Sequence, residues 1–179
     1  MREKVKINKS IVKGLLLYGG LIWFVLIIAI IPHFGGMMAL HDPGDFGISK
    51  YTIADTLYFA WRFPLTYLVV SLIHTKWSVA FPVGWYYSMF AISMLQVVVD
   101  LMRGDFFVAW VILIDSLAFG AAIYFFSLVT LRIIHNNMFI KSDNYFVRWF
   151  GALKMSLGEY LQWLLGTYVL YLVVNLFVD

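Results

Sequence analysis

The sequence contains no cysteine, and this absence excludes three kinds of chemistry at once. Disulfide bonds, thiolate metal sites and cysteine nucleophiles all require a sulfhydryl group, which the 179 residues do not supply. Charge is also scarce, because charged residues make up only 13% of the chain, against about 25% in an ordinary soluble domain. So few charged side chains cannot cover the surface of a soluble protein of this length. The composition therefore excludes an ordinary soluble domain.

Hydrophobic residues are abundant instead, at 63% of the chain, compared with about 45–50% in soluble domains. This composition predicts an all-α protein, a polytopic transmembrane helix bundle that forms a single domain over residues 1–179. The formal net charge is +3, but the basic residues lie between apolar runs and form no continuous patch. They therefore indicate membrane topology and not a nucleic-acid partner. The lipid bilayer is the first expected partner.

Five apolar runs reach or approach the roughly 20 residues that a hydrocarbon core of about 30 Å requires. The predicted spans are residues 14–33, 55–74, 79–101, 106–131 and 156–178. A mixture of aromatic and basic residues at 145–155, just before the last span, is typical of a helix that lies in the headgroup layer. We expect Phe146 and Trp149 to contact lipid there, while Arg148 and Lys154 reach water or phosphate.

The distribution of lysine and arginine between alternate loops predicts the orientation. One set of loops carries ten of these residues, namely the five of the N-terminal tail together with Lys76, Arg132, Lys141, Arg148 and Lys154. The other set carries Lys50 and Arg103. By the positive-inside rule the N-terminus is cytoplasmic, and five spans then place the C-terminus outside. We therefore expect a multi-pass protein of the cytoplasmic (inner) membrane.

Two ionisable residues within the predicted spans carry opposite charges, Arg62 and Asp115. A charge at the middle of the bilayer costs about 2.5–3.5 kcal/mol on translocon scales, so it usually has a partner. Arg62 lies seven residues beyond Asp55, and Asp115 lies nine beyond Phe106, which places both about 10–14 Å below the outer interface. The sequence therefore predicts an ion pair between the second and fourth spans. Such a pair is either structural or part of a substrate, ion or proton site.

Further polar residues recur at intervals of three and four, which places them on common helix faces that we expect to turn inward, away from lipid. The four stripes are Asp55–Tyr58–Arg62–Thr66, Ser93–Gln96–Asp100, Ser116–Gly120–Tyr124–Ser127 and Glu159–Gln162–Gly166. The predicted intramembrane polar core consists of Arg62, Asp115, Asp55, Gln96, Asp100, Glu159 and Gln162.

No catalytic residue, metal ligand or cofactor is predicted. His74 and His135 fall at the inner ends of the second and fourth spans, where a pair of histidines could ligate a haem or a metal. Histidine at a membrane–water interface is, however, an ordinary occurrence, and a transmembrane haem usually has its ligands within the spans. We therefore interpret these two residues as interfacial.

Three classes of function fit the sequence. The first is a non-enzymatic membrane protein that acts as a homo-oligomer or as the membrane subunit of a larger complex, with its polar core serving transport, gating or partner docking. The second is a membrane-embedded enzyme for a lipid or lipid-linked substrate, with Asp100, Asp115, Arg62 and His41 as its polar set. The third is a sensor of membrane damage or an effector of permeability, such as a phage-defence membrane protein. The absence of a nucleophile–base motif favours the first class.

Overall fold

The computed structural model describes residues 17–18, 20–21, 24–25, 28 and 50–177. Residues 50–177 form the helices α3 (Lys50–Ser71), α4 (Ala80–Arg103), α5 (Phe106–Asn137) and α6 (Tyr145–Asn175), with a short 3₁₀ helix η2 (Lys76–Val79) between α3 and α4. Every regular element in this part of the chain is a helix, as the sequence predicts. The first predicted span, 14–33, lies largely outside the described residues.

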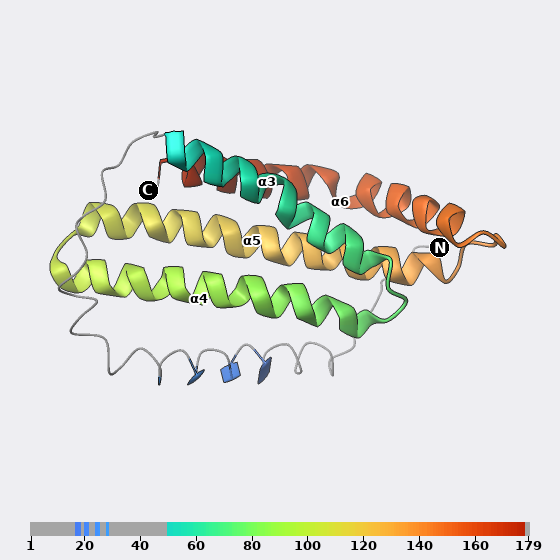
Figure 1. Ribbon diagram of the computed structural model, residues 1–179, viewed down its shortest axis with the longest axis horizontal. Helices are drawn as coiled ribbons and strands as arrows, with labels where there is room; N and C mark the ends of the chain where they lie inside the picture. The colour runs from blue at the N-terminus through green and yellow to red at the C-terminus, as the bar shows by residue number, and fades with distance from the viewer. Residues whose placement is uncertain (1–16, 19, 22–23, 26–27, 29–49, 178–179) are drawn as a thin grey trace.

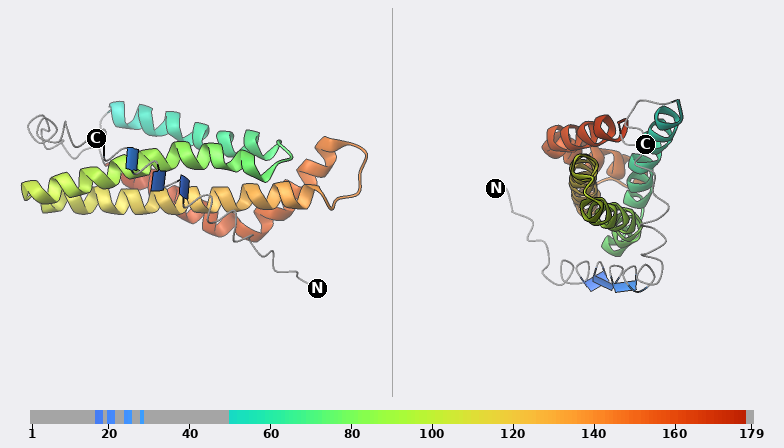
Figure 2. Two further views of the ribbon diagram at one scale, coloured as in Figure 1. Left: turned by 90° about the horizontal axis from the view of Figure 1, so that it is seen from below. Right: turned by 90° about the vertical axis from the view of Figure 1, so that its left-hand side faces the viewer.

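Helix α5 is at the centre of the bundle and packs against α3, α4 and α6. In Figure 1, α4 lies below α5, whereas α3 and α6 lie above it. The end-on view in Figure 2 shows α3 and α6 on opposite sides of this central pair. Apart from η2, these elements run roughly parallel to one long axis, as expected of helices that cross one bilayer.

Three of the described helical segments are long and apolar enough to cross a membrane, namely residues 76–103, 106–137 and 145–175. They mark the chain as a membrane protein. Helix α3 is not among them, because Asp55 and Arg62 lower the hydropathy of its 22 residues. Its bounds nevertheless lie close to those of the predicted span 55–74.

The turn between α4 and α5 is defined by Gly104, whose φ of +88° is the left-handed conformation that glycine adopts at little cost. The backbone N–H of Asp105 donates to the carbonyl of Asp100 at 3.0 Å and so satisfies one carbonyl of the last turn of α4. Helix α5 then begins at Phe106. The sequence predicts this tight connection correctly.

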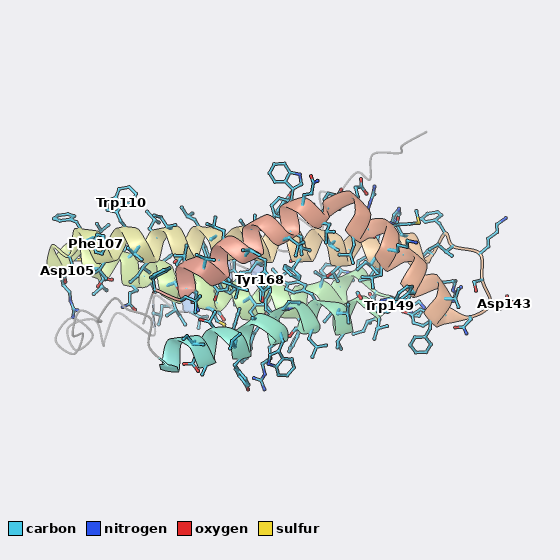
Figure 3. All side chains as sticks on the ribbon, turned by 90° about the horizontal axis from the view of Figure 1, so that it is seen from above. Asp105, Phe107, Trp110, Asp143, Trp149 and Tyr168 are labelled. Carbon is cyan, nitrogen blue, oxygen red and sulfur yellow. The ribbon has the colours of Figure 1, made fainter. Side chains whose placement is uncertain are left out.

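Residues 145–155 differ from their expected form. We expected a separate interfacial helix, but α6 runs without interruption from Tyr145 to Asn175 and contains both this segment and the last span. The ribbon of α6 bends along its length in Figure 3, so the first part points away from the direction of the rest. Phe146 is exposed, whereas Trp149 faces the bundle, where its Nε1 donates to Ser71 Oγ at 2.9 Å. The expectation that Trp149 contacts lipid is therefore wrong.

The core between the four helices is built from aromatic rings. Phe63 lies at its centre, fully buried, with its ring centroid 4.6 Å from that of Tyr86 and 4.9 Å from that of Phe126. We call the continuous set of rings around it the aromatic core: Phe59, Phe63, Tyr67, Tyr86, Phe119, Phe126, Tyr168 and Tyr171. Tilted and stacked aromatic pairs contribute about 0.5–1.5 kcal/mol each beyond area burial. These rings therefore fix how α3, α4, α5 and α6 pack.

Candidate functional site

The predicted ion pair between Arg62 and Asp115 is not formed. Arg62 lies on the exposed side of α3, where its guanidinium carbon is 4.0 Å from the centre of the Tyr58 ring and 5.8 Å from that of Trp61. Side chains of a helix lean toward its N-terminus, and Arg62 accordingly stacks on the ring one turn earlier. A cation over an aromatic face is stabilised without a carboxylate, so Arg62 does not require Asp115 as a partner.

Asp115, by contrast, lies in the interior of the bundle. Its side chain is 9% exposed, and Oδ1 forms no hydrogen bond to any described residue. The next residue, Ser116, is 1% exposed, and its hydroxyl is likewise unbonded among the described residues. A polar group buried in this way normally has a partner, because leaving it without one costs about 1–3 kcal/mol.

Two of the predicted polar stripes do not turn inward. On α3, Asp55 and Tyr58 are exposed with Arg62, and on α6 Glu159, Gln162 and Gly166 are exposed. The expectation of inward faces is wrong for both helices, because their bulky aromatic residues occupy the interior instead. The stripe on α4 agrees better, since Asp100 is fully buried and Gln96 is half-buried. Whether these seven residues form a functional site stays a prediction.

Glu159 has a partner on α5 that the sequence did not indicate. Its carboxylate accepts from Arg132 in an ion pair with an N–O distance of 3.3 Å. The two side chains are 47% and 21% exposed. An exposed ion pair of this kind contributes about 0–1 kcal/mol to the stability of the fold. Its main effect is therefore to neutralise the charge of Glu159. Nearby, Asn136 Nδ2 donates to Ser156 Oγ at 3.2 Å and also joins α5 to α6.

Four buried tyrosines carry hydroxyl groups into the interior of the bundle. The ring centroids of Tyr168 and Tyr171 are 6.5 Å apart, and those of Tyr67 and Tyr86 are 5.9 Å apart. A hydrogen bond of 3.2 Å joins Ser127 Oγ and the Tyr67 hydroxyl. We call this set the buried tyrosines: Tyr67, Tyr86, Tyr168 and Tyr171.

The buried tyrosines come from α3, α4 and α6, and hydrogen bonds hold several of them in place. Tyr168 donates to the carbonyl oxygen of Ala60 at 2.6 Å, and Tyr86 donates to Thr66 Oγ1 at 3.0 Å. The four tyrosines are between 1% and 7% exposed. Figure 3 shows Tyr168 on the part of α6 that lies over the middle of the bundle. The buried tyrosines therefore occupy the interior of the bundle.

Sequence reasoning missed the four tyrosines because it searched for residues that are polar throughout. Tyrosine has an apolar ring, and 11 tyrosines are spread over the chain, so no single one stands out. The available signal was their spacing. Phe63 and Tyr67 are four residues apart, and Tyr168 and Tyr171 are three apart, which places each pair on one helix face.

A concave feature lies between α4 and α5, and it is apolar. This cleft has a volume of about 310 Å³ and is lined by Tyr87, Phe90, Leu117, Gly120, Ala121 and Ile123. A Cβ added at Gly120 would lie 3.2 Å from the Phe90 ring, so the glycine permits the close approach of the two helices. No charged side chain lines the cleft, and it offers no chemistry beyond apolar contact.

The described residues contain no group of three or more histidine, cysteine, aspartate or glutamate side chains that could hold a metal ion. His74 lies beside Tyr145, with the two ring centroids 4.5 Å apart, and His135 lies beside Phe139 at 4.9 Å. Both histidines therefore make aromatic contacts at the same end of the bundle.

Comparisons with known proteins add no assignment. No protein-family model matches the sequence, no curated protein matches it, and no solved structure matches its fold.

Proposed function

We propose that the chain is a multi-pass protein of the cytoplasmic (inner) membrane that acts as a homo-oligomer or as the membrane subunit of a larger complex. In this proposal α3 and the segment 14–33 are spans as well, which gives five. The N-terminus is cytoplasmic and the C-terminus is outside. The excess of lysine and arginine in one set of loops supports this orientation.

The observation that carries the proposal is the exposed face of α6 around Gln162. Gln162 is exposed on a helix that is long and apolar enough to span the membrane, and none of the described residues forms a hydrogen bond with its amide. Gly158 and Gly166 lie four residues before and after it, and a Cβ at either glycine would meet open space. These three residues share one side of the helix.

An amide that faces hydrocarbon has no water to bond with, so it is stabilised by a partner of its own kind. In membrane helices, glycine and other small residues allow two backbones to approach closely, and a hydrogen bond across such an interface contributes about 0.6–2 kcal/mol. A glutamine amide both donates and accepts, so it can bond to a second copy or to another subunit. The face of α6 thus fits a helix-docking surface.

Among the roles that the polar core could serve, partner docking is the one that this face supports. The enzyme alternative requires its acidic and basic residues to converge on one substrate, yet Arg62 stacks on an exposed face while Asp115 is buried. For the third class, a sensor of membrane damage or an effector of permeability, no residue is specific to the function, so no substitution tests it.

The test compares variants of α6 purified in mild detergent. We expect the unaltered protein to have a mass above the 20.7 kDa of one chain, or to retain a second protein. Gln162→Leu removes the amide and Gly166→Leu blocks close approach, so either change should release the single chain. Leu161→Val, an exposed apolar change on another side of the same helix, is the control. The measurement is light scattering with mass analysis of whatever co-purifies.

A wild-type protein that is a single chain, with nothing bound, would contradict the proposal. So would a Gln162→Leu variant that keeps the full assembly while Leu161→Val loses it, because the docking face would then lie elsewhere.

A further inference from the structure

The end of the bundle where α6 begins carries an excess of positive charge. At this end α3 stops, η2 begins and residues 138–144 connect α5 to α6, and Figure 3 shows it around Trp149 and Asp143. The connection contains one acid, Asp143. Four cations here form no ion pair with any residue that the structure describes, and we call them the basic end: Lys76, Lys141, Arg148 and Lys154.

Arg148 is the member of the basic end that a neighbouring ring supports. It is half-buried, and its guanidinium carbon lies 5.9 Å from the centre of the Tyr145 ring. Tyr145 is itself anchored, because its hydroxyl donates to the carbonyl of Leu72 at 2.6 Å and its ring centroid is 4.5 Å from that of His74. Arg148 Nε is buried and forms no hydrogen bond within the described part of the chain. A buried N–H of a charged group normally has an acceptor.

Large aromatic side chains are exposed at the same end. They come from three segments, with Trp77 in η2, Phe139 in the connection, and Phe146 and Phe150 in the first turns of α6, and they are between 64% and 70% exposed. A single protein partner would cover one side of the bundle, whereas a bilayer surrounds it and meets all three segments at one depth. Aromatic rings interspersed with lysine and arginine are typical of the headgroup layer.

The chemistry of that layer narrows the ligand of Arg148. The acceptors that lipid headgroups offer at this depth are phosphate oxygens, and a guanidinium group binds two of them at once. A zwitterionic headgroup brings a cation of its own to a surface whose four cations already have no ion pair, whereas an anionic headgroup brings only negative charge. Basic clusters at the ends of membrane helices attract anionic lipids for this reason.

We propose that the basic end is a binding site for an anionic phospholipid and that Arg148 donates hydrogen bonds to its phosphate oxygens. The Tyr145 ring supports the guanidinium group, and the three lysines make the local potential positive. In the orientation proposed above, this end is cytoplasmic. The choice of leaflet therefore rests on that orientation, whereas binding of the lipid does not.

The test is native mass spectrometry of the full-length protein in mild detergent, titrated separately with phosphatidylglycerol and with phosphatidylcholine of the same acyl chains. We expect the protein to retain phosphatidylglycerol at the lower concentration. Arg148→Gln should weaken binding of phosphatidylglycerol by about tenfold or more, because it removes charge-assisted hydrogen bonds to phosphate, and should leave binding of phosphatidylcholine unchanged. Arg148→Lys keeps the charge without the planar fork, so its affinity should fall between those of Arg148→Gln and the wild type.

Arg62→Gln and Arg62→Lys are the matched controls, since Arg62 is exposed on α3 and stacks on Tyr58. Both should bind phosphatidylglycerol as the wild type does. If Arg148→Gln does not fold, the comparison of Arg148→Lys with Arg62→Lys decides. Equal affinity of the wild type for the two lipids, or equal losses at positions 62 and 148, would overturn the proposal.

Two further outcomes would overturn the lipid as the ligand. One is displacement of phosphatidylglycerol by inorganic phosphate at the same concentration, which would identify a soluble anion instead. The other is an acidic protein that co-purifies with the wild type and is lost in Arg148→Gln. Mass spectrometry resolves lipid bound to single chains from lipid bound to assemblies, so failure of the lipid site is distinguishable from failure of the docking face around Gln162.

Discussion

At the scale of single residues, Phe63 lies at the centre of the aromatic core. Its side chain has no exposed surface, and its ring contacts aromatic residues of all three neighbouring helices, among them Tyr86, Phe126 and Tyr168. Trp61, two residues earlier on the same helix, is 55% exposed. The two positions thus offer a comparison of a buried and an exposed ring on one element.

Phe63→Ala should lower the free energy of unfolding by about 3–5 kcal/mol, because it removes buried surface and leaves a cavity among rings that cannot collapse into it. Trp61→Ala removes a larger ring from an exposed position and should cost much less. Thermal unfolding in the same detergent measures both. Equal losses for the two variants would mean that the aromatic core does not hold the helices together.

The same scale shows why the polar core was predicted only in part. Asp115 and Asp100 were identified because a carboxylate in an apolar run stands out, and both are buried. Arg62 was assigned the wrong partner, since sequence does not reveal which side of a helix faces the bundle when both sides carry aromatic rings. Tyr58 and Tyr67 are the same residue type on one helix, yet only Tyr67 is buried.

At the scale of helices and turns, the helices between residues 50 and 177 could be predicted, and three of them are long and apolar enough to span a membrane, whereas the ends of the helices could not be predicted. The turn at Gly104 follows directly from its residues, and α5 begins where the apolar run begins. Helix α5 continues, however, to Asn137, and α6 starts at Tyr145, so the polar residues between 132 and 155 are largely helical. Contacts across the bundle stabilise these ends, as in the hydrogen bond from Tyr145 to the carbonyl of Leu72 at 2.6 Å. Such contacts between distant residues leave no local trace in the sequence.

The turn itself supplies the next prediction. Gly104→Ala should destabilise the protein by about 1–2 kcal/mol, because an alanine Cβ is strained at a positive φ. Gly104→Asn should cost less, since asparagine tolerates the left-handed conformation better than other residues with a side chain. No other atom lies within 4 Å of the added Cβ, so the loss reports backbone strain alone. The measurement is the unfolding midpoint of both variants, and an alanine variant as stable as the wild type would contradict it.

At the scale of the whole molecule, the absence of cysteine makes the proposed orientation simple to test. Single cysteines can be introduced at Val5 in the N-terminal tail, at Gly44 in the loop after the first predicted span, and at Asp143 between α5 and α6. Figure 3 shows Asp143 at the tip of the last of these connections. In intact cells, a membrane-impermeant thiol reagent should label Gly44→Cys and leave the other two unlabelled. Lysed cells, in which all three should react, are the control, and labelling at position 143 but not at 44 would invert the orientation.

The length of α5 has a further consequence for the shape of the protein in its membrane. Its 32 residues correspond to about 48 Å of helix, whereas the hydrocarbon core is about 30 Å thick. Even a tilt of about 40°, the largest commonly seen, does not bring the whole helix within that thickness. A membrane-spanning α5 therefore extends beyond the hydrocarbon core into the headgroup layer, and its C-terminal part carries the polar residue Arg132, which pairs with Glu159. The rigid C-terminal part of α5 thus carries the connection from residue 138 to 144 out of the hydrocarbon core.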